Sequence, residues 1–196
     1  MGKKGLFSFI AVVGVGLIIF FVVSKEINRL GEQTSSNRES YINNTASMQI
    51  TSPAFDSNGQ IPEKYTCEGE GVNPPLQFKD VPPEAKSLAL IVDDPDAPSS
   101  TWVHWLVWNI SPLATGIAEN SFPPEAIQGM TDFGQQQYGA PCPPSGSHRY
   151  FFKLYALDSK LSLSSFSDKA ALEKAILPHL LTKAELVGLY QRKTLR

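Results

Sequence analysis

Three short apolar runs in the chain have the length and composition of buried β-strands. Residues 87–92 read Ser-Leu-Ala-Leu-Ile-Val and end at acidic residues and a proline. Residues 102–110 combine three tryptophans with β-branched side chains, and residues 150–157 are rich in aromatic residues. The pattern therefore predicts three strands, each bordered by a loop.

Side-chain alternation along a strand places every second residue on the same face. It predicts two groups that each share a face: Trp102, His104, Leu106 and Trp108 on one strand, and His148, Tyr150 and Phe152 on another. Both histidines then lie at or near the start of a strand, next to a loop. Arg149 is predicted to face the opposite side from its neighbours and to form a structural salt bridge.

The segments around these strands carry weaker signals. Residues 111–147 are rich in Gly, Pro, Ser and Gln and are predicted to be mostly loop, and so long a loop is usually functional. Residues 168–181 have helical spacing, with Ser167 as the expected N-cap and Pro178 as the expected kink or end. Residues 184–192 are ambiguous, because the preceding Thr-Lys-Ala-Glu sequence also reads as a capping box for a second helix.

The beginning of the chain is of a different kind. Residues 6–24 form an uninterrupted uncharged run after a short tail, residues 1–5. A helix of this length spans roughly 28 Å, about the hydrocarbon thickness of a bilayer. A cleaved signal peptide is the main alternative, but its apolar region usually has only about 7–15 residues. We therefore expect a retained transmembrane helix over residues 6–24.

Residues 25–46 are expected to form a flexible tether, because their polar composition offers too little apolar surface to offset the entropy of ordering. Lysines flank the apolar run on both sides, so the positive-inside rule is nearly balanced. The short N-terminal tail favours a signal-anchor whose following domain is exported. We expect a single-pass membrane protein that carries residues 47–196 as an extracytoplasmic domain.

Composition limits the fold and the partners. The length of 196 residues, 42% of them hydrophobic, allows one sizeable core. Fifteen prolines argue against a long helical bundle and favour a β-rich or loop-rich domain. A net charge of −2 and a pI of about 5.9 give no general attraction to nucleic acid.

Ionisable groups gather at the ends of the predicted strands. Asp94 and Asp96 flank a proline, and proline restricts both its own backbone and that of the preceding residue. An ordinary β-turn explains this motif equally well when it is taken alone. His104 and His148 are each explained alone as core histidines bonded to the backbone. Two imidazoles beside one carboxylate, however, are suited to act as paired hydrogen-bond donors to an anion.

Three motifs together resemble the phosphatidylethanolamine-binding protein family, which includes Raf-kinase-inhibitor-like proteins, and its bacterial and archaeal branch fits best. They are residues 93–98 (Asp-Asp-Pro-Asp-Ala-Pro), 102–108 (Trp-Val-His-Trp-Leu-Val-Trp) and 146–150 (Gly-Ser-His-Arg-Tyr). The resemblance extends from about residue 48 to 192. It implies a mainly β fold, a two-sheet Greek-key β-sandwich with one or two short helices, and a closing strand over residues 184–192.

The resemblance also implies a small anion-binding pocket for phosphate-type head groups. Its expected lining comprises Asp94, Asp96, His104, His148 and Tyr150, with Trp102, Gly139 and Pro141 in the walls. No cofactor is expected. Cys67 and Cys142 are the two cysteines of the chain, and their pairing stays open, because a disulfide suits an exported domain while both segments also occur in cytoplasmic relatives.

The leading hypothesis is a membrane-tethered binding module that also regulates a kinase or protease, as eukaryotic relatives do. A second hypothesis is a phosphoester hydrolase, in which Asp94, His104 and His148 bind a metal or serve as acid and base. Serines lie near the motifs, but none occupies a nucleophile-elbow sequence. A third hypothesis is a vestigial pocket in a domain that acts through its surface loops.

Overall fold

The computed structural model describes residues 25, 29 and 47–193, and its compact unit beginning at Ser47 forms the domain discussed below. The predicted transmembrane segment, residues 6–24, lies outside the described residues, as does most of the predicted tether. Within the described part of the chain, no helix has both the length and the apolar character needed to cross a bilayer.

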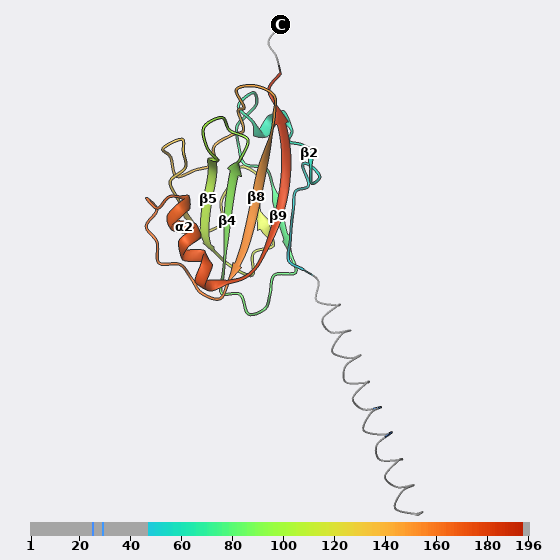
Figure 1. Ribbon diagram of the computed structural model, residues 1–196, viewed down its shortest axis with the longest axis vertical. Helices are drawn as coiled ribbons and strands as arrows, with labels where there is room; N and C mark the ends of the chain where they lie inside the picture. Colours follow the sequence, from blue (N-terminus) through green and yellow to red (C-terminus); the bar gives the residue numbers. More distant parts are fainter. Residues whose placement is uncertain (1–24, 26–28, 30–46, 194–196) are drawn as a thin grey trace, which may run out of the picture. The chain divides into compact units, whose positions relative to one another are not determined.

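Two β-sheets form the domain, together with one α-helix and two short 3-10 turns (Figure 1). The smaller sheet has the order β1 (Gln49–Thr51), β3 (Leu76–Lys79) and β6 (Gly116–Ile117). The larger sheet has the order β2 (Gly59–Gln60), β9 (Leu180–Gln191), β8 (Ser147–Leu157), β4 (Ser87–Asp94), β5 (Trp102–Ile110) and β7 (Ile127–Gln128). All pairs are antiparallel except β2 with β9, which is parallel.

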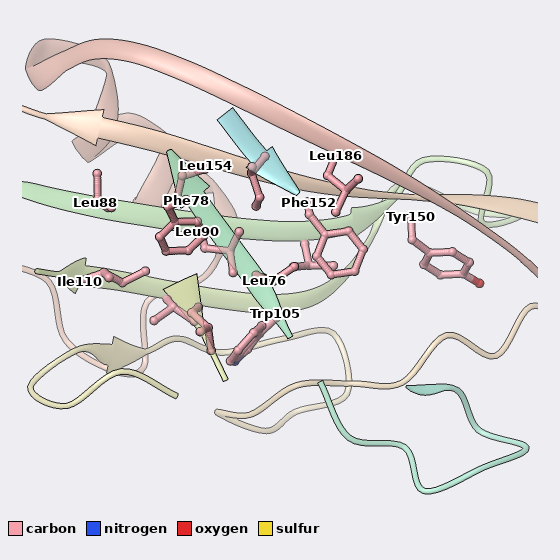
Figure 2. Close-up of a cluster of buried hydrophobic side chains, with 14 of the residues drawn as sticks. Leu76, Phe78, Leu88, Leu90, Trp105, Ile110, Tyr150, Phe152, Leu154 and Leu186 are labelled. Carbon is pink, nitrogen blue, oxygen red and sulfur yellow. The ribbon is translucent and has the colours of Figure 1, made fainter. Parts of the chain in front are cut away.

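The main core lies between the two sheets. Phe78 of the smaller sheet belongs to the same buried cluster as Leu90, Trp105 and Phe152 of the larger one (Figure 2). Alternating buried residues along β8 point into this core, as expected for a strand with one covered face. The two-sheet sandwich implied by the sequence is therefore confirmed.

A second apolar cluster covers the other face of the larger sheet. Helix α2 (Lys169–Ile176) contributes Leu172 and Ile176 to it, and they pack with Ile91 and Trp108. Because the sheet is covered on both sides here, β4 is buried along its whole length. This explains why its sequence is a continuous apolar run rather than an alternating one.

The start of the helix differs by one residue from the sequence expectation. Asp168 is the N-cap instead of Ser167, and its Oδ1 accepts a hydrogen bond from the backbone N–H of Ala171 at 2.9 Å. Aspartate caps a helix as well as serine does, so sequence alone does not separate the two. The α-helix ends at Ile176 and continues as a 3-10 turn, η2 (Leu177–His179), because Pro178 cannot donate an α-helical hydrogen bond.

A β-bulge in β5 overturns one prediction about side-chain faces. Val92 of β4 pairs with Trp105, whereas the next residue of β4 pairs with Val103, so His104 is an extra residue in the ladder. As a result, Trp105 joins the core between the sheets, and Leu106 lies on the helix side. The predicted grouping of Trp102 and His104 with Leu106 and Trp108 on one face is therefore wrong.

The remaining strand predictions hold. The runs at 87–92, 102–110 and 150–157 are the cores of β4, β5 and β8, and residues 180–191 form the closing strand β9 rather than a second capped helix. The long loop contains two two-residue strands, β6 and β7. An additional 3-10 turn, η1 (Glu63–Tyr65), precedes the first cysteine.

Candidate functional site

A cavity of about 240 Å³ opens where the end of β4 and the starts of β5 and β8 meet. Five of the expected site residues line it: Asp94, Trp102, His104, His148 and Tyr150. The rest of the lining comes from loops, namely Ala97, Pro98, Phe133 and residues 142–144. The three strands thus bring together the side chains that are far apart in the sequence.

Asp94 and His148 form a buried pair in the lining of this cavity. Their side chains are only 5% and 9% exposed, and Nδ1 of His148 lies 2.7 Å from Oδ2 of Asp94. The other carboxylate oxygen accepts the backbone N–H of Asp96 at 2.8 Å, so the carboxylate is held from two sides. This arrangement fixes the orientation of the imidazole and leaves its Nε2 without a described protein partner.

His104 is held in a different way. Its Nδ1 lies 2.7 Å from the carbonyl oxygen of Gly139, and a carbonyl can only accept, so Nδ1 carries a proton. Burial lowers the pKa of His104, and the carbonyl offsets this only in part. A neutral ring with its proton on Nδ1 presents Nε2 as an acceptor. The two imidazoles are therefore not the equivalent donors that the sequence suggested.

Tyr150 supplies an unused donor. Its side chain is buried, and its hydroxyl makes no hydrogen bond of normal length to the described residues, although the Asp94 carboxylate lies nearby and also favours the protonated hydroxyl. Burial, and then the nearby negative charge of Asp94, raise the pKa of Tyr150 above its ordinary value, so the hydroxyl keeps its proton. Figure 2 shows the hydroxyl pointing away from the apolar cluster. Such an orphaned group is costly unless a water or ligand satisfies it.

The walls of the cavity differ from the expectation. Gly139 and Pro141 do not line it; Trp102 and Phe133 do, with their rings edge-to-face at 5.7 Å. Gly139 lies directly behind Phe133, and a Cβ at this position would overlap the phenyl ring. Its glycine is therefore explained by close packing, and its carbonyl holds His104.

Asp96 also lies outside the cavity, because its carboxylate is engaged by Arg149. Nε and a terminal nitrogen of the guanidinium lie 2.9 and 2.7 Å from the two carboxylate oxygens. The backbone N–H of Arg149 donates to the same group at 2.9 Å. The structural salt bridge predicted for Arg149 is confirmed, and it ties the acidic turn to β8.

This ion pair predicts a pH-dependent contribution to stability. Hydrogen bonds from Arg149 depress the pKa of Asp96 from 3.8 to about 2. A folded-state pKa below the unfolded value stabilises the fold above about pH 4, and this stabilisation is lost as the pH falls towards 2. Because Arg149 is 54% exposed, solvent screens the ion pair, and we expect Arg149→Ala to lower the free energy of unfolding only slightly at neutral pH.

Urea unfolding of the wild type and Arg149→Ala at about pH 6 and about pH 2 measures this contribution. The difference in unfolding free energy between the two proteins is expected to shrink at the lower pH. A difference of the same size at both pH values would show that the ion pair contributes nothing and that the loss comes from packing.

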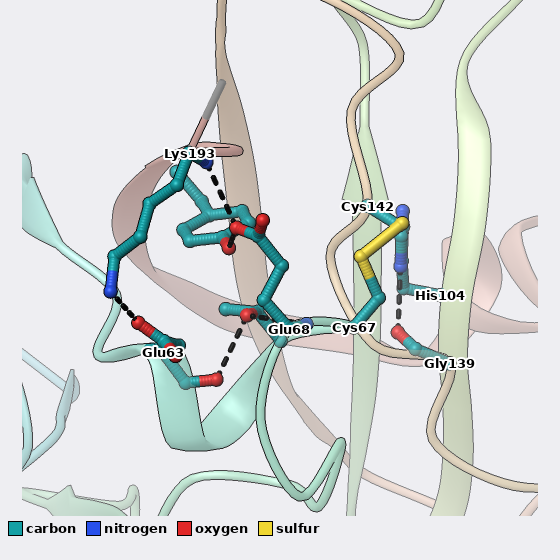
Figure 3. The surroundings of a disulfide bond; sticks show 9 residues. Glu63, Cys67, Glu68, His104, Gly139, Cys142 and Lys193 are labelled. Atoms are coloured by element: carbon teal, nitrogen blue, oxygen red, sulfur yellow. Dashed lines mark hydrogen bonds and ion pairs between the residues drawn. A yellow bond between two sulfur atoms is a disulfide. The ribbon is translucent and has the colours of Figure 1, made fainter. Parts of the chain in front are cut away.

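The two cysteines, left open by the sequence, form a disulfide with their Cα atoms 5.4 Å apart (Figure 3). The bond joins the segment after η1 to the segment that ends in the cavity wall, since Cys142 lines the cavity. The backbone N–H of Cys67 also donates to the carbonyl of Pro141 at 3.0 Å. Next to it, the Glu68 carboxylate accepts from the Tyr190 hydroxyl, so the segment is tied to β9 as well.

The side chains invoked for hydrolysis are only partly brought together. Asp94 contacts His148, but His104 is bonded to a backbone carbonyl, and no cluster of three or more potential metal ligands occurs within the described ranges. Four serines lie close to the motifs in the sequence, and none of them lines the cavity: Ser99, Ser100, Ser145 and Ser147.

The domain matches known proteins over nearly its full length. The family model described as phosphatidylethanolamine-binding protein matches residues 51–191. A UPF0098 protein of Methanothermobacter thermautotrophicus is 50% identical over 150 residues, which cover 74% of this chain and 99% of the relative. A UPF0098 protein of Chlamydia muridarum is 46% identical over 152 residues, again covering 74% of this chain and 99% of the relative.

Two crystal structures share the fold. A putative phosphatidylethanolamine-binding protein homolog from Chlamydia trachomatis superposes with a TM-score of 0.73 at 45% identity, covering 75% of this chain and 99% of its own. Escherichia coli YbcL, described as a member of the mammalian family, superposes with a TM-score of 0.71 at 34% identity, covering 76% and 100%. Sequence and fold thus agree, and the chain belongs to the phosphatidylethanolamine-binding protein family.

Proposed function

We propose that the cavity binds the phosphate group of a small phosphate-type ligand, such as a phospholipid head group. The observation that carries this proposal is the buried, unpartnered hydroxyl of Tyr150 beside the fixed Asp94–His148 pair. A phosphate oxygen accepts hydrogen bonds and can satisfy this hydroxyl. The name of the family points to the same ligand class.

The polar side chains in the cavity offer different hydrogen bonds to a ligand. When protonated, His148 donates from Nε2 to a phosphate oxygen while Asp94 balances its charge. Tyr150 donates a second hydrogen bond to the phosphate. The acceptor Nε2 of His104 suits a ligand group that still carries a hydrogen, such as a phosphate hydroxyl or the ammonium of an ethanolamine.

The size of the cavity supports a small ligand. Its volume of about 240 Å³ accommodates a head group, while acyl chains would have to remain outside. Trp102 and Phe133 are 39% and 43% exposed and flank the opening, so they offer apolar surface to whatever extends from the phosphate.

Calorimetric titration with inorganic phosphate and phosphoethanolamine tests the proposal. Residues 47–196 are suitable for this, because the solved relatives consist of this domain alone over 99% and 100% of their chains. Loss of a charged hydrogen bond costs about 1.5–3 kcal/mol, so His148→Ala is expected to weaken binding by about tenfold or more. Tyr150→Phe is expected to weaken it by about threefold to tenfold.

His179→Ala is the matched control. The side chain of this histidine is 40% exposed and is paired with Asp158 at 2.8 Å, away from the cavity, so its loss should leave binding unchanged. Equal affinities for the wild type, His148→Ala and Tyr150→Phe would contradict the proposed site.

We further propose that residues 6–24 tether the domain to a membrane and that the domain is extracytoplasmic. Two observations support this: the uncharged run at the start of the chain and a disulfide, which persists mainly in oxidising compartments. The full chain is expected to stay in the membrane fraction at alkaline pH, and external protease should degrade the domain in intact spheroplasts. Release at alkaline pH, or protection from protease, would contradict this placement.

The other hypotheses from the sequence have less support in the structure. Hydrolysis through a serine or threonine nucleophile has no support, because no serine or threonine lines the cavity. A vestigial pocket does not explain why a buried acid and histidine are kept paired at 2.7 Å. Regulation of a kinase or protease stays a prediction, because no described contact bears on it.

A further inference from the structure

A second cavity lies on the other side of the β5 bulge. It has a volume of about 310 Å³ and shares no lining residue with the first. Trp105 of β5, Gln128 of β7 and Tyr138 of the long loop form part of its lining. We propose that this cavity binds a neutral, hydroxyl-rich ligand such as a short saccharide.

The lining of the second cavity carries no charge at neutral pH. Tyr138 is the only ionisable side chain among its lining residues. Burial raises the pKa of Tyr138 above its ordinary value, and its hydroxyl donates to the carbonyl of Tyr65 at 3.2 Å. A charged ligand would therefore lose hydration here without meeting an opposite charge, which favours a neutral one.

Three amide side chains offer both donors and acceptors. Oε1 of Gln128 accepts the indole N–H of Trp105 at 2.6 Å, which fixes the amide and leaves its N–H groups without a described partner. Nε2 of Gln137 donates to Gln135 at 2.7 Å, which leaves the Oε1 of Gln137 as an acceptor. The Asn120 side chain makes no described hydrogen bond and contributes both kinds of group. Vicinal hydroxyls, which donate and accept at once, match such a lining.

Aromatic rings provide the apolar part of the cavity. Trp105 and Tyr138 pack edge-to-face at 5.7 Å, and Phe122 is 49% exposed while lining the cavity. An exposed ring next to fixed amides suits the alternation of C–H faces and hydroxyls around a sugar ring, whose C–H face covers the aromatic surface.

An extended peptide is a less suitable ligand for the second cavity. Peptides commonly bind by adding a strand to a free sheet edge. Here β5 is paired on both sides, because Val107 faces Leu90 of β4 and Gln128 of β7. The free edge next to the cavity belongs to β7, whose 2 residues offer little backbone to an added strand.

The test is a nitrogen-15 NMR titration of residues 47–196 with maltose, cellobiose and diacetylchitobiose, with the uncharged tripeptide N-acetyl-Ala-Ala-Ala-amide as the comparison ligand. Binding is expected to shift, in a saturable way, the side-chain amide signals of Asn120, Gln128 and Gln137. The indole N–H of Trp105 should shift with them, whereas the imidazole signals of His104 and His148 should not. This separates the second cavity from the phosphate site.

Phe122→Ala is expected to weaken saccharide binding by about tenfold, which corresponds to about 1.4 kcal/mol of lost stacking. Phe166→Ala is the matched control, because Phe166 is 76% exposed and does not line the cavity. Gln128→Glu retains the acceptor for Trp105 but removes the free donor, so it should also weaken binding. These substitutions are near or at the surface, and the unchanged remainder of each spectrum shows that the variant is folded.

Three outcomes would overturn the inference. The first is the absence of saturable shifts with all three saccharides. The second is equal saccharide affinity for the wild type, Phe122→Ala and Phe166→Ala. The third is a response to the tripeptide alone, which would assign the cavity to peptides instead.

Discussion

Replacing Trp105 with alanine is expected to lower the free energy of unfolding by about 3–5 kcal/mol. The side chain is 1% exposed and belongs to the core between the two sheets. Its removal leaves a cavity and also deprives Gln128 of the indole N–H that it accepts at 2.6 Å. Urea unfolding followed by far-ultraviolet circular dichroism measures the change, since tryptophan fluorescence is itself altered by the substitution.

Trp102→Ala is the matched control for this prediction. Trp102 lies on the same strand but is 39% exposed, and its ring packs edge-to-face against Phe133, which is 43% exposed. We expect its removal to cost about 1 kcal/mol or less. Equal losses for the two variants would contradict the placement of the bulge, which assigns one tryptophan to the core and the other to the rim of the ligand cavity.

Removing the disulfide is expected to cost roughly 2–5 kcal/mol of unfolding free energy. The bond closes a loop between cysteines 75 positions apart, and long loops gain most from such a constraint in the chain-entropy description. The double substitution Cys67→Ser/Cys142→Ser tests this by urea unfolding. It avoids the single substitutions, which would leave a free thiol.

Treatment with dithiothreitol supplies the control for this experiment. Reductant is expected to destabilise the wild type and to leave the double variant unchanged. A double variant as stable as the oxidised wild type would show that the other contacts of this segment suffice, namely the hydrogen bond from Cys67 to Pro141 and that from Tyr190 to Glu68.

Local patterns predicted the strands well, because each strand carries its own signal. The continuous apolar run of β4 and the alternation in β8 both reflect how many faces of the sheet are covered. The bulge at His104 is different, since it depends on the register between β4 and β5 rather than on the sequence of either strand. Alternation applied without the bulge therefore grouped Trp102 and His104 with Leu106 and Trp108, although it placed Trp105 correctly on the opposite face.

The acidic residues and histidines of the site were identified through the family resemblance. The structure shows which of these side chains contact one another. The pairing of Asp94 with His148 joins residues 54 positions apart, and the engagement of Asp96 by Arg149 removes it from the cavity. No local pattern distinguishes these two aspartates. Phe133 was missed because it belongs to a loop, and only its packing against Gly139 reveals its role in the wall.

The central claim is that a phosphate group binds between His148, Tyr150 and His104. The most direct measurement is the imidazole nitrogen-15 spectrum of residues 47–196 during titration with phosphoethanolamine. The chain has three histidines, so His179, which lies outside the cavity and is paired with Asp158, serves as an internal reference. We predict saturable shifts of Nε2 in His104 and His148 and none in His179. No shift in any ring, or a shift in His179 alone, would contradict the account.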